Sequence, residues 1–176
     1  FRPDQPRTPV TIKSFPIADK RIQQAMPLLH QSLNGSSALR RKLFQVEFLA
    51  TLAGDLLVTL VYHRQLDKVW ESAAQTLLVE LRSHTDSISI IGRSRKQKLV
   101  LGREFVQEVL SVHGNTYRYR QYEQSFSQPN GRINIRMIEW ACEHASAQPG
   151  DLLELYCGNG NFTLPLSQHF DHVIAT

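Results

Sequence analysis

The spacing of apolar residues changes near Pro129, and this change divides the chain into two parts. Before it, residues 43–52 alternate, which predicts a strand with Phe44, Val46 and Phe48 on one face. A turn at residues 53–55 leads into the apolar residues 56–62, so the pattern predicts a β-hairpin.

Two helices and further short strands complete the first part. Residues 18–33 carry an apolar stripe behind the predicted cap Asp19, although Pro27 interrupts it, and residues 68–82 have clear amphipathic spacing. Short strands are predicted at residues 9–13, 87–92, 98–102 and 117–122. Strands joined by tight turns, with helices between them, favour an α+β domain with a largely antiparallel sheet over residues 1–126.

The second part, residues 127–176, follows a different pattern. Asn130 is predicted to cap a helix over residues 131–147, with its inward face formed by Ile133, Met137, Trp140 and Ala141. A strand at 151–156, a glycine loop, a helix at 162–169 and a strand at 171–176 form a βαβ unit with parallel strands. Two parallel strands cannot bury both of their faces, so this unit is the start of a larger doubly wound domain. The fold class is therefore α/β overall.

Composition excludes several classes of protein. The chain has 176 residues, of which 41% are hydrophobic and 20% charged, so it is neither a disordered tail nor a membrane span. We expect a cytoplasmic protein, because the two cysteines cannot form a disulfide framework and no signal peptide opens the chain. Residues 1–128 carry a net charge of +7 and residues 129–176 carry a net charge of −3. The positive charge of the first part indicates either a surface that binds a polyanion or a surface that only faces solvent.

The glycine loop after the strand at 151–156 offers the most specific chemistry. Gly158 and Gly160 let the backbone approach a ligand at the carboxyl end of the strand. A dinucleotide fingerprint would need a third glycine where Thr163 stands, whereas Glu154 before the loop fits the S-adenosylmethionine loop of class I methyltransferases. The alternative is a glycine turn that serves only strand-to-helix packing.

Three segments together resemble a known family. Asp-Leu-Leu-Glu-Leu-Tyr-Cys-Gly-Asn-Gly-Asn-Phe at 151–162, Ser-Phe-Ser-Gln-Pro-Asn at 125–130 and Arg-Lys-Leu-Phe-Gln at 41–45 are similar to the bacterial tRNA (uracil-5-)-methyltransferases. The resemblance implies an RNA-binding α+β domain followed by the first βαβ part of a class I, Rossmann-like methyltransferase domain. It also implies an enzyme that uses S-adenosylmethionine to methylate carbon 5 of a T-loop uridine in tRNA.

The resemblance assigns two sets of site residues. Gln128, Tyr156, Gly158 and Asn161 match the family's contacts to S-adenosylmethionine. For RNA binding the candidates are the aromatic and imidazole side chains of Phe44, His63 and Phe126 and the cations Arg41 and Lys42, a combination that suits looped RNA. Alternatively, Phe44 is a core residue, His63 a strand-end histidine and Phe126 an apolar staple before the helix.

The family's catalytic groups are not encoded here. Its nucleophile lies in a Ser-Cys-Asn-Pro segment and a catalytic Asp in an Asp-Pro-Pro-Arg segment, and neither occurs in the 176 residues. Cys157 is therefore interpreted as a small residue in the loop and Cys142 as a core residue. We expect a metal-free monomer that does not transfer methyl groups in this form. The alternatives are a ribosomal RNA uracil-5 methyltransferase, a non-catalytic RNA-binding module, and a small-molecule methyltransferase, which would not need the basic half.

Overall fold

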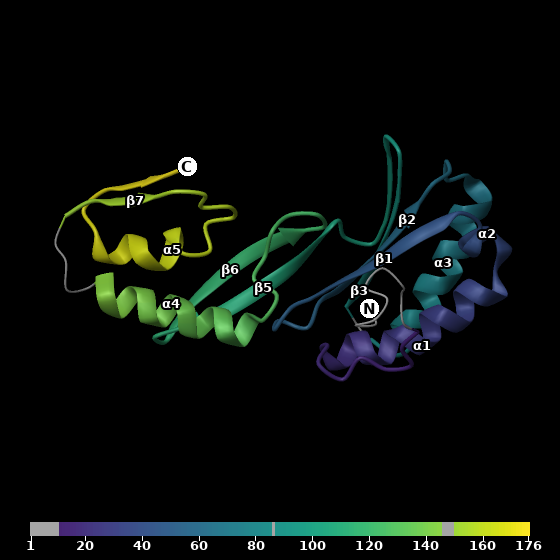
Figure 1. Cartoon of the computed structure of the whole chain (residues 1–176), viewed down its shortest axis with the longest axis horizontal. Helices are drawn as coiled ribbons and strands as arrows, with labels where there is room; N and C mark the ends of the chain where they lie inside the picture. Colours follow the sequence, from purple (N-terminus) through teal and green to yellow (C-terminus); the bar gives the residue numbers. More distant parts are fainter. Residues whose placement is uncertain (1–10, 86, 146–149) are drawn as a thin grey trace, which may run out of the picture.

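The computed structural model describes residues 11–85, 87–145 and 150–176, and Figure 1 shows their arrangement. The helical elements are α1 (Lys20–Gly35), α2 (Ser37–Arg40), α3 (Lys68–Arg82), α4 (Gly131–Ala145), α5 (Thr163–Leu166) and the short 3₁₀ turn η1 (Ser167–His169). The strands are β1 (Leu43–Ala50), β2 (Leu56–Tyr62), β3 (Ile88–Ser94), β4 (Gln97–Leu101), β5 (Phe105–Val112), β6 (Asn115–Tyr122), β7 (Leu152–Glu154) and β8 (Val173–Ala175).

A four-stranded sheet in the order β1-β2-β3-β4 carries the main core. Its β1–β2 and β3–β4 pairs are antiparallel, and β2–β3 is parallel because α3 crosses between them. Helices α1 and α3 pack on the sheet (Figure 1) and bury the fully enclosed Trp70. Asp67 accepts a hydrogen bond from the Trp70 N–H at 2.9 Å and caps α3, which spans the predicted residues 68–82.

The predicted strand at 43–52 is confirmed, but its predicted face is wrong at one residue. A bulge between Leu43 and Gln45 leaves Phe44 outside the regular register. Because a bulge re-aims the side chains on either side of it, Leu43 joins Val46 and Phe48 against the core, and Phe44 is 62% exposed. Phe44 is therefore not a core residue.

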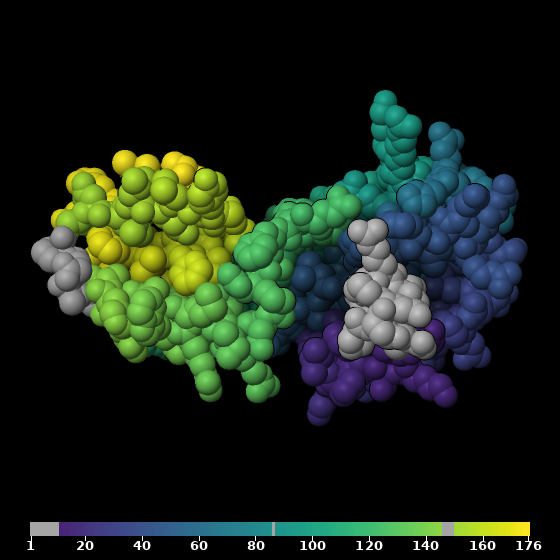
Figure 2. Space-filling model, in the orientation of Figure 1, coloured from purple at the N-terminus to yellow at the C-terminus, as the bar shows by residue number. Residues whose placement is uncertain are grey.

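Strands β5 and β6 form a separate antiparallel pair that connects the two halves of the molecule (Figures 1 and 2). The sequence pattern predicted β6 but overlooked β5. Buried residues of this pair pack against Ile138 and Cys142 of α4 and against α5, so the hairpin shares a core with the C-terminal elements. The division at residue 126 stays a prediction.

The predicted inward face of α4 is wrong. Asn130 caps the helix through its side-chain Oδ1, which accepts a hydrogen bond from the Ile133 N–H at 3.1 Å, as expected. However, the buried residues are Asn134, Ile138 and Cys142, whereas Ile133, Met137 and Trp140 are 47%, 41% and 62% exposed. The predicted and observed inward faces of α4 differ by a rotation of about one residue. The helix packs against β5 and β6 with the face that contains Asn134.

Strands β7 and β8 pair in parallel, as the βαβ pattern predicted. Each is three residues long and leaves apolar side chains such as Leu153 and Ile174 exposed. Of the predicted strand at 9–13, residues 9 and 10 lie outside the described residues, and residues 11–13 are not in a strand.

Two carboxylates join the β1–β2 turn to β5. Asp55 accepts from the Gln107 N–H at 2.8 Å and from Arg103 at 2.6 Å, and Glu108 accepts from the Leu52 N–H at 2.9 Å. Burial raises the pKa of Asp55, but hydrogen bonds, including those from Gln107 and Arg103, outweigh it and leave the pKa below its usual value. For Glu108 burial wins and raises the pKa.

Candidate functional site

An exposed aromatic pair marks the start of β1. The rings of Phe44 and His63 lie 4.4 Å apart at a tilt of 55°. The His63 N–H donates to the Lys42 carbonyl at 3.0 Å, and Lys42 itself adopts a left-handed backbone with φ 58°. The structure thus brings together three of the five predicted RNA-binding residues, in what we call the aromatic ridge: Lys42, Phe44 and His63.

Arg64 holds this ridge to helix α2. Its guanidinium donates to the carbonyls of Ala38 at 2.6 Å, Arg41 at 3.0 Å and Gln65 at 2.8 Å. These bonds fix the backbone of Arg41 next to Lys42 and leave the Arg41 side chain exposed. Four of the five predicted residues therefore lie in one place, whereas Phe126 lies elsewhere.

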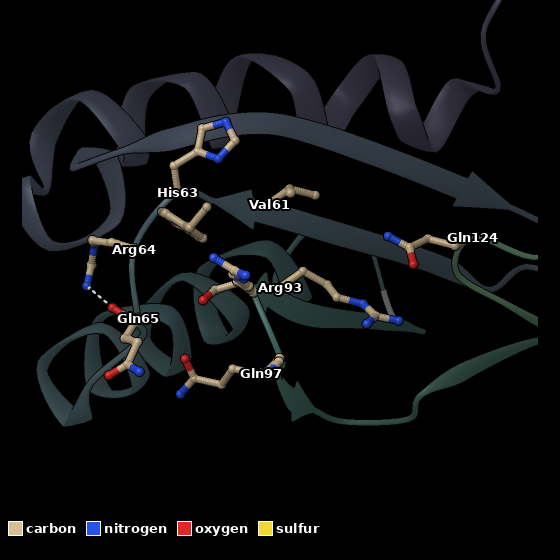
Figure 3. Close-up of a pocket in the computed structure, with 11 residues that line it drawn as sticks. Val61, His63, Arg64, Gln65, Arg93, Gln97 and Gln124 are labelled. Atoms are coloured by element: carbon tan, nitrogen blue, oxygen red, sulfur yellow. Dashed lines mark hydrogen bonds between the residues drawn. The ribbon is translucent and has the colours of Figure 1, made fainter.

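Two open hollows flank the aromatic ridge, and Arg64 lines both. The helix hollow, about 590 Å³, includes Arg40 and Arg41. The hairpin hollow, about 920 Å³, lies between the end of β2 and the β3–β4 hairpin, as Figure 3 shows. Its lining residues are Val61, Tyr62, His63, Arg64, Gln65, Arg93, Ser94, Arg95, Lys96, Gln97 and Gln124.

All four predicted cofactor residues line a second, smaller site together with Phe126. This loop cleft has a volume of about 120 Å³. Its lining residues are Gln121, Phe126, Ser127, Gln128, Glu154, Tyr156, Cys157, Gly158, Asn159, Asn161 and Phe162. Segments 121–128 and 154–162 are distant in sequence, so their meeting here is a result of the fold.

The backbone of the glycine loop is bent through three left-handed residues. Tyr156, Gly158 and Gly160 have φ values of 60°, 59° and 78°. This conformation suits glycine but is unfavourable for tyrosine, whose side chain is 96% exposed at the mouth of the cleft. Gly158 lines the cleft, and a Cβ added there would meet nothing within 4 Å.

A pair of amides fixes the far end of the loop. Asn134 and Asn161 exchange two hydrogen bonds, at 2.8 Å and 2.9 Å, and the Tyr119 hydroxyl donates to the Asn161 carbonyl at 3.2 Å. Burial raises the pKa of Tyr119 to about 12, so this hydroxyl keeps its proton. Asn161 therefore shapes the loop with an amide that is already engaged.

Sequence reasoning missed several of these residues. The sequence pattern assigns no role to Asn134, which interrupts an apolar stripe, or to the cations Arg95 and Lys96 of the β3–β4 turn. Two other aromatic residues near basic side chains, Tyr62 and Tyr119, are only 3% and 5% exposed and belong to the core.

Comparison with known proteins decides the family. The tRNA (Uracil-5-)-methyltransferase family model matches residues 1–176. The chain belongs to this family. It is 51% identical over its whole length to a tRNA/tmRNA (uracil-C(5))-methyltransferase of Dechloromonas aromatica, of which it covers 47%, and 52% identical to the protein of the same name from Aromatoleum aromaticum, of which it covers 46%.

A solved structure supports the fold. The Pyrococcus abyssi tRNA (uracil-54, C5)-methyltransferase, in complex with S-adenosyl-L-homocysteine, aligns with 96% of this chain and 43% of its own, at a TM-score of 0.63 and 17% identity. The chain spans about half the length of the curated relatives it matches. Within its described residues, no helix combines the length and the apolar character that a membrane span needs.

Proposed function

We propose that this chain is the RNA-binding part, and the beginning of the cofactor-binding part, of an enzyme that methylates carbon 5 of a T-loop uridine in tRNA. The observation that carries the proposal is the presence of two separate sites in one family member. An exposed aromatic ridge lies between basic hollows, and the residues predicted to bind the cofactor line one glycine-loop cleft. RNA would bind at the first site and S-adenosylmethionine at the second.

The loop cleft suits one end of S-adenosylmethionine. Ligand pockets usually measure about 300–1,000 Å³, so a cleft of about 120 Å³ encloses only part of such a molecule. Polar side chains of Gln128 and Glu154 and the open backbone at Gly158 would face it, and the cofactor would supply its sulfonium methyl group. We therefore expect weak cofactor binding by this chain alone.

Cys157 is not proposed as the nucleophile, although it lines the loop cleft. A thiolate that attacks ring carbon 6 of uracil must be directed at the base. Cys157 instead lies within the loop, where its N–H donates to the Thr176 carbonyl at 2.9 Å and its carbonyl accepts from the Gly160 N–H at 2.9 Å. Its backbone thus holds the loop to β8.

The proposal is tested by product analysis. The parent enzyme, incubated with methyl-tritiated S-adenosylmethionine and unmodified tRNA, should place label in 5-methyluridine at the T-loop position after nucleoside digestion. The 176-residue chain alone should place none. Label that enters only ribosomal RNA or only a small molecule would contradict the proposal, and label transferred by the chain alone would show that the catalytic groups lie within it.

Location and assembly belong to the same proposal. An enzyme that acts on tRNA would work in the cytoplasm, and a monomer would suffice because both sites lie on one chain. Sedimentation of the purified parent enzyme, with and without tRNA, would test the monomer.

A further inference from the structure

The tip of the β3–β4 hairpin carries two cations that the fold does not use. Arg95 and Lys96 form the turn between the paired residues Ser94 and Gln97, and both are exposed. Within the described part of the chain, neither side chain has a hydrogen bond or an ion pair. The hairpin projects from the body of the molecule as the tall teal segment of Figures 1 and 2.

The other two cations of the hairpin hollow are already engaged. Arg64 donates to three backbone carbonyls. Arg93 donates to Glu123 at 2.7 Å and 3.1 Å, and Lys98 lies 3.3 Å from the same carboxylate, whose side chain is only 3% exposed. Arg64 also lies 3.7 Å from the Asp67 carboxylate, and Arg93 is paired with Glu123. Arg95 and Lys96 are therefore the cations of the hollow whose charge no described carboxylate pairs.

The turn itself is unfavourable for its residues. Lys96 has φ 59°, a conformation that hairpin turns usually give to glycine, asparagine or aspartate. A lysine in this position stabilises the turn less than a glycine would. Because backbone strain tends to collect at functional positions, the side chain of Lys96 is better explained by an external partner than by folding.

The hollow also lies between the two sites described above. His63 of the aromatic ridge lines one side, and Gln124 lines another, as both labels in Figure 3 show. Gln124 is only two residues before Phe126, which lines the loop cleft. A strand that leaves the aromatic ridge toward the cleft would therefore pass the hairpin tip.

We propose that Arg95 and Lys96 bind consecutive phosphates of the RNA strand in the hairpin hollow, next to the base held at the aromatic ridge. This inference rests on the proposed function, because it takes RNA as the ligand. The guanidinium of Arg95 can bind a phosphate with two parallel hydrogen bonds, and Lys96 supplies a point charge. Exposed amides at Gln65 and Gln124 can reach phosphate or ribose oxygens.

The test measures binding of fluorescein-labelled unmodified tRNA to the chain by anisotropy, over salt concentrations of about 0.05 to 0.3 M. Arg95→Ser and Lys96→Gly should each weaken binding about fivefold at about 0.1 M salt and lower the salt slope by about 0.7, the value for one lost contact to a single strand. The control is Lys20→Ala, which removes one positive charge from the exposed start of α1, outside the hollow.

Thermal unfolding separates binding from folding. Lys96→Gly should unfold at the same temperature as the unaltered chain or higher, because glycine adopts φ 59° freely. Weaker binding by a variant of equal stability supports the inference. Unchanged affinity and slope in both variants, or an equal loss in Lys20→Ala, would overturn it and leave the proposed function standing. Failure of the unaltered chain to bind tRNA would contradict both.

Discussion

Replacement of Phe44 by alanine tests the aromatic ridge. The ring is 62% exposed and lies 4.4 Å from the His63 ring, so one face is free to stack on a base. Stacking of a base on an aromatic side chain contributes about 1–3 kcal/mol, which corresponds to about 5- to 150-fold in the dissociation constant. Because the ring is mostly exposed, Phe44→Ala should lower the free energy of unfolding by much less than the ~3–5 kcal/mol lost when a buried phenylalanine is replaced by alanine.

The chain offers a matched control at Trp140. This side chain is also 62% exposed and also stacks on a histidine, His144, at 4.2 Å, but it lies on α4. Anisotropy with labelled tRNA should show weaker binding for Phe44→Ala and unchanged binding for Trp140→Ala, with thermal unfolding measured for both. If Phe44→Ala binds normally, or unfolds before it can be assayed, the ring supports the fold and the reasoning is refuted.

Three further predictions concern the fold and the cleft. The pKa of Asp55 is lowered in the folded state, so the stabilisation by its carboxylate is present above the unfolded pKa near 3.8 and is lost as pH falls through the folded pKa. The free energy of unfolding, measured with urea between about pH 6 and pH 3, should therefore fall less steeply with pH in Asp55→Asn than in the unaltered chain, and equal pH dependence would contradict this. Gly158→Asp in the parent enzyme should abolish S-adenosylmethionine binding in calorimetry, because it adds a charged side chain, at a residue with φ 59°, to the lining of the cleft; unaltered affinity would exclude the loop from the cofactor site. Asn134→Ala removes both hydrogen bonds to Asn161 and should lower the free energy of unfolding by about 1–3 kcal/mol. It should also weaken cofactor binding as much as Asn161→Ala does. An effect on cofactor binding in only one of the two variants would contradict a shared role.

Local patterns predicted the elements that local forces determine. Helix α3 has the predicted bounds because its apolar stripe lies within the segment and its cap, Asp67, directly precedes it. The parallel pairing of β7 and β8 followed from the strand, loop, helix and strand order. In the same way, the glycine loop was found from Gly158 and Gly160 alone.

Features that depend on distant partners were not predicted. The bulge that exposes Phe44 adds a residue to the pairing with β2, which alternation within β1 cannot reveal. Asn134 made the truly buried stripe of α4 look polar, because its partner Asn161 lies 27 residues away. The hairpin hollow likewise needs the end of β2, the β3–β4 turn and Gln124 at once, and no single segment indicates it.

Selective binding of T-arm RNA by this chain is the most direct test of the account. The central claim is that the RNA-binding site lies within these 176 residues, whereas the groups that catalyse methyl transfer lie outside them. The measurement compares an unmodified T-arm stem–loop with a stem–loop of the same length and an unrelated loop, at one salt concentration. We expect tighter binding of the T-arm, and loss of that preference in Phe44→Ala. Equal binding of the two RNAs, or none, would contradict it.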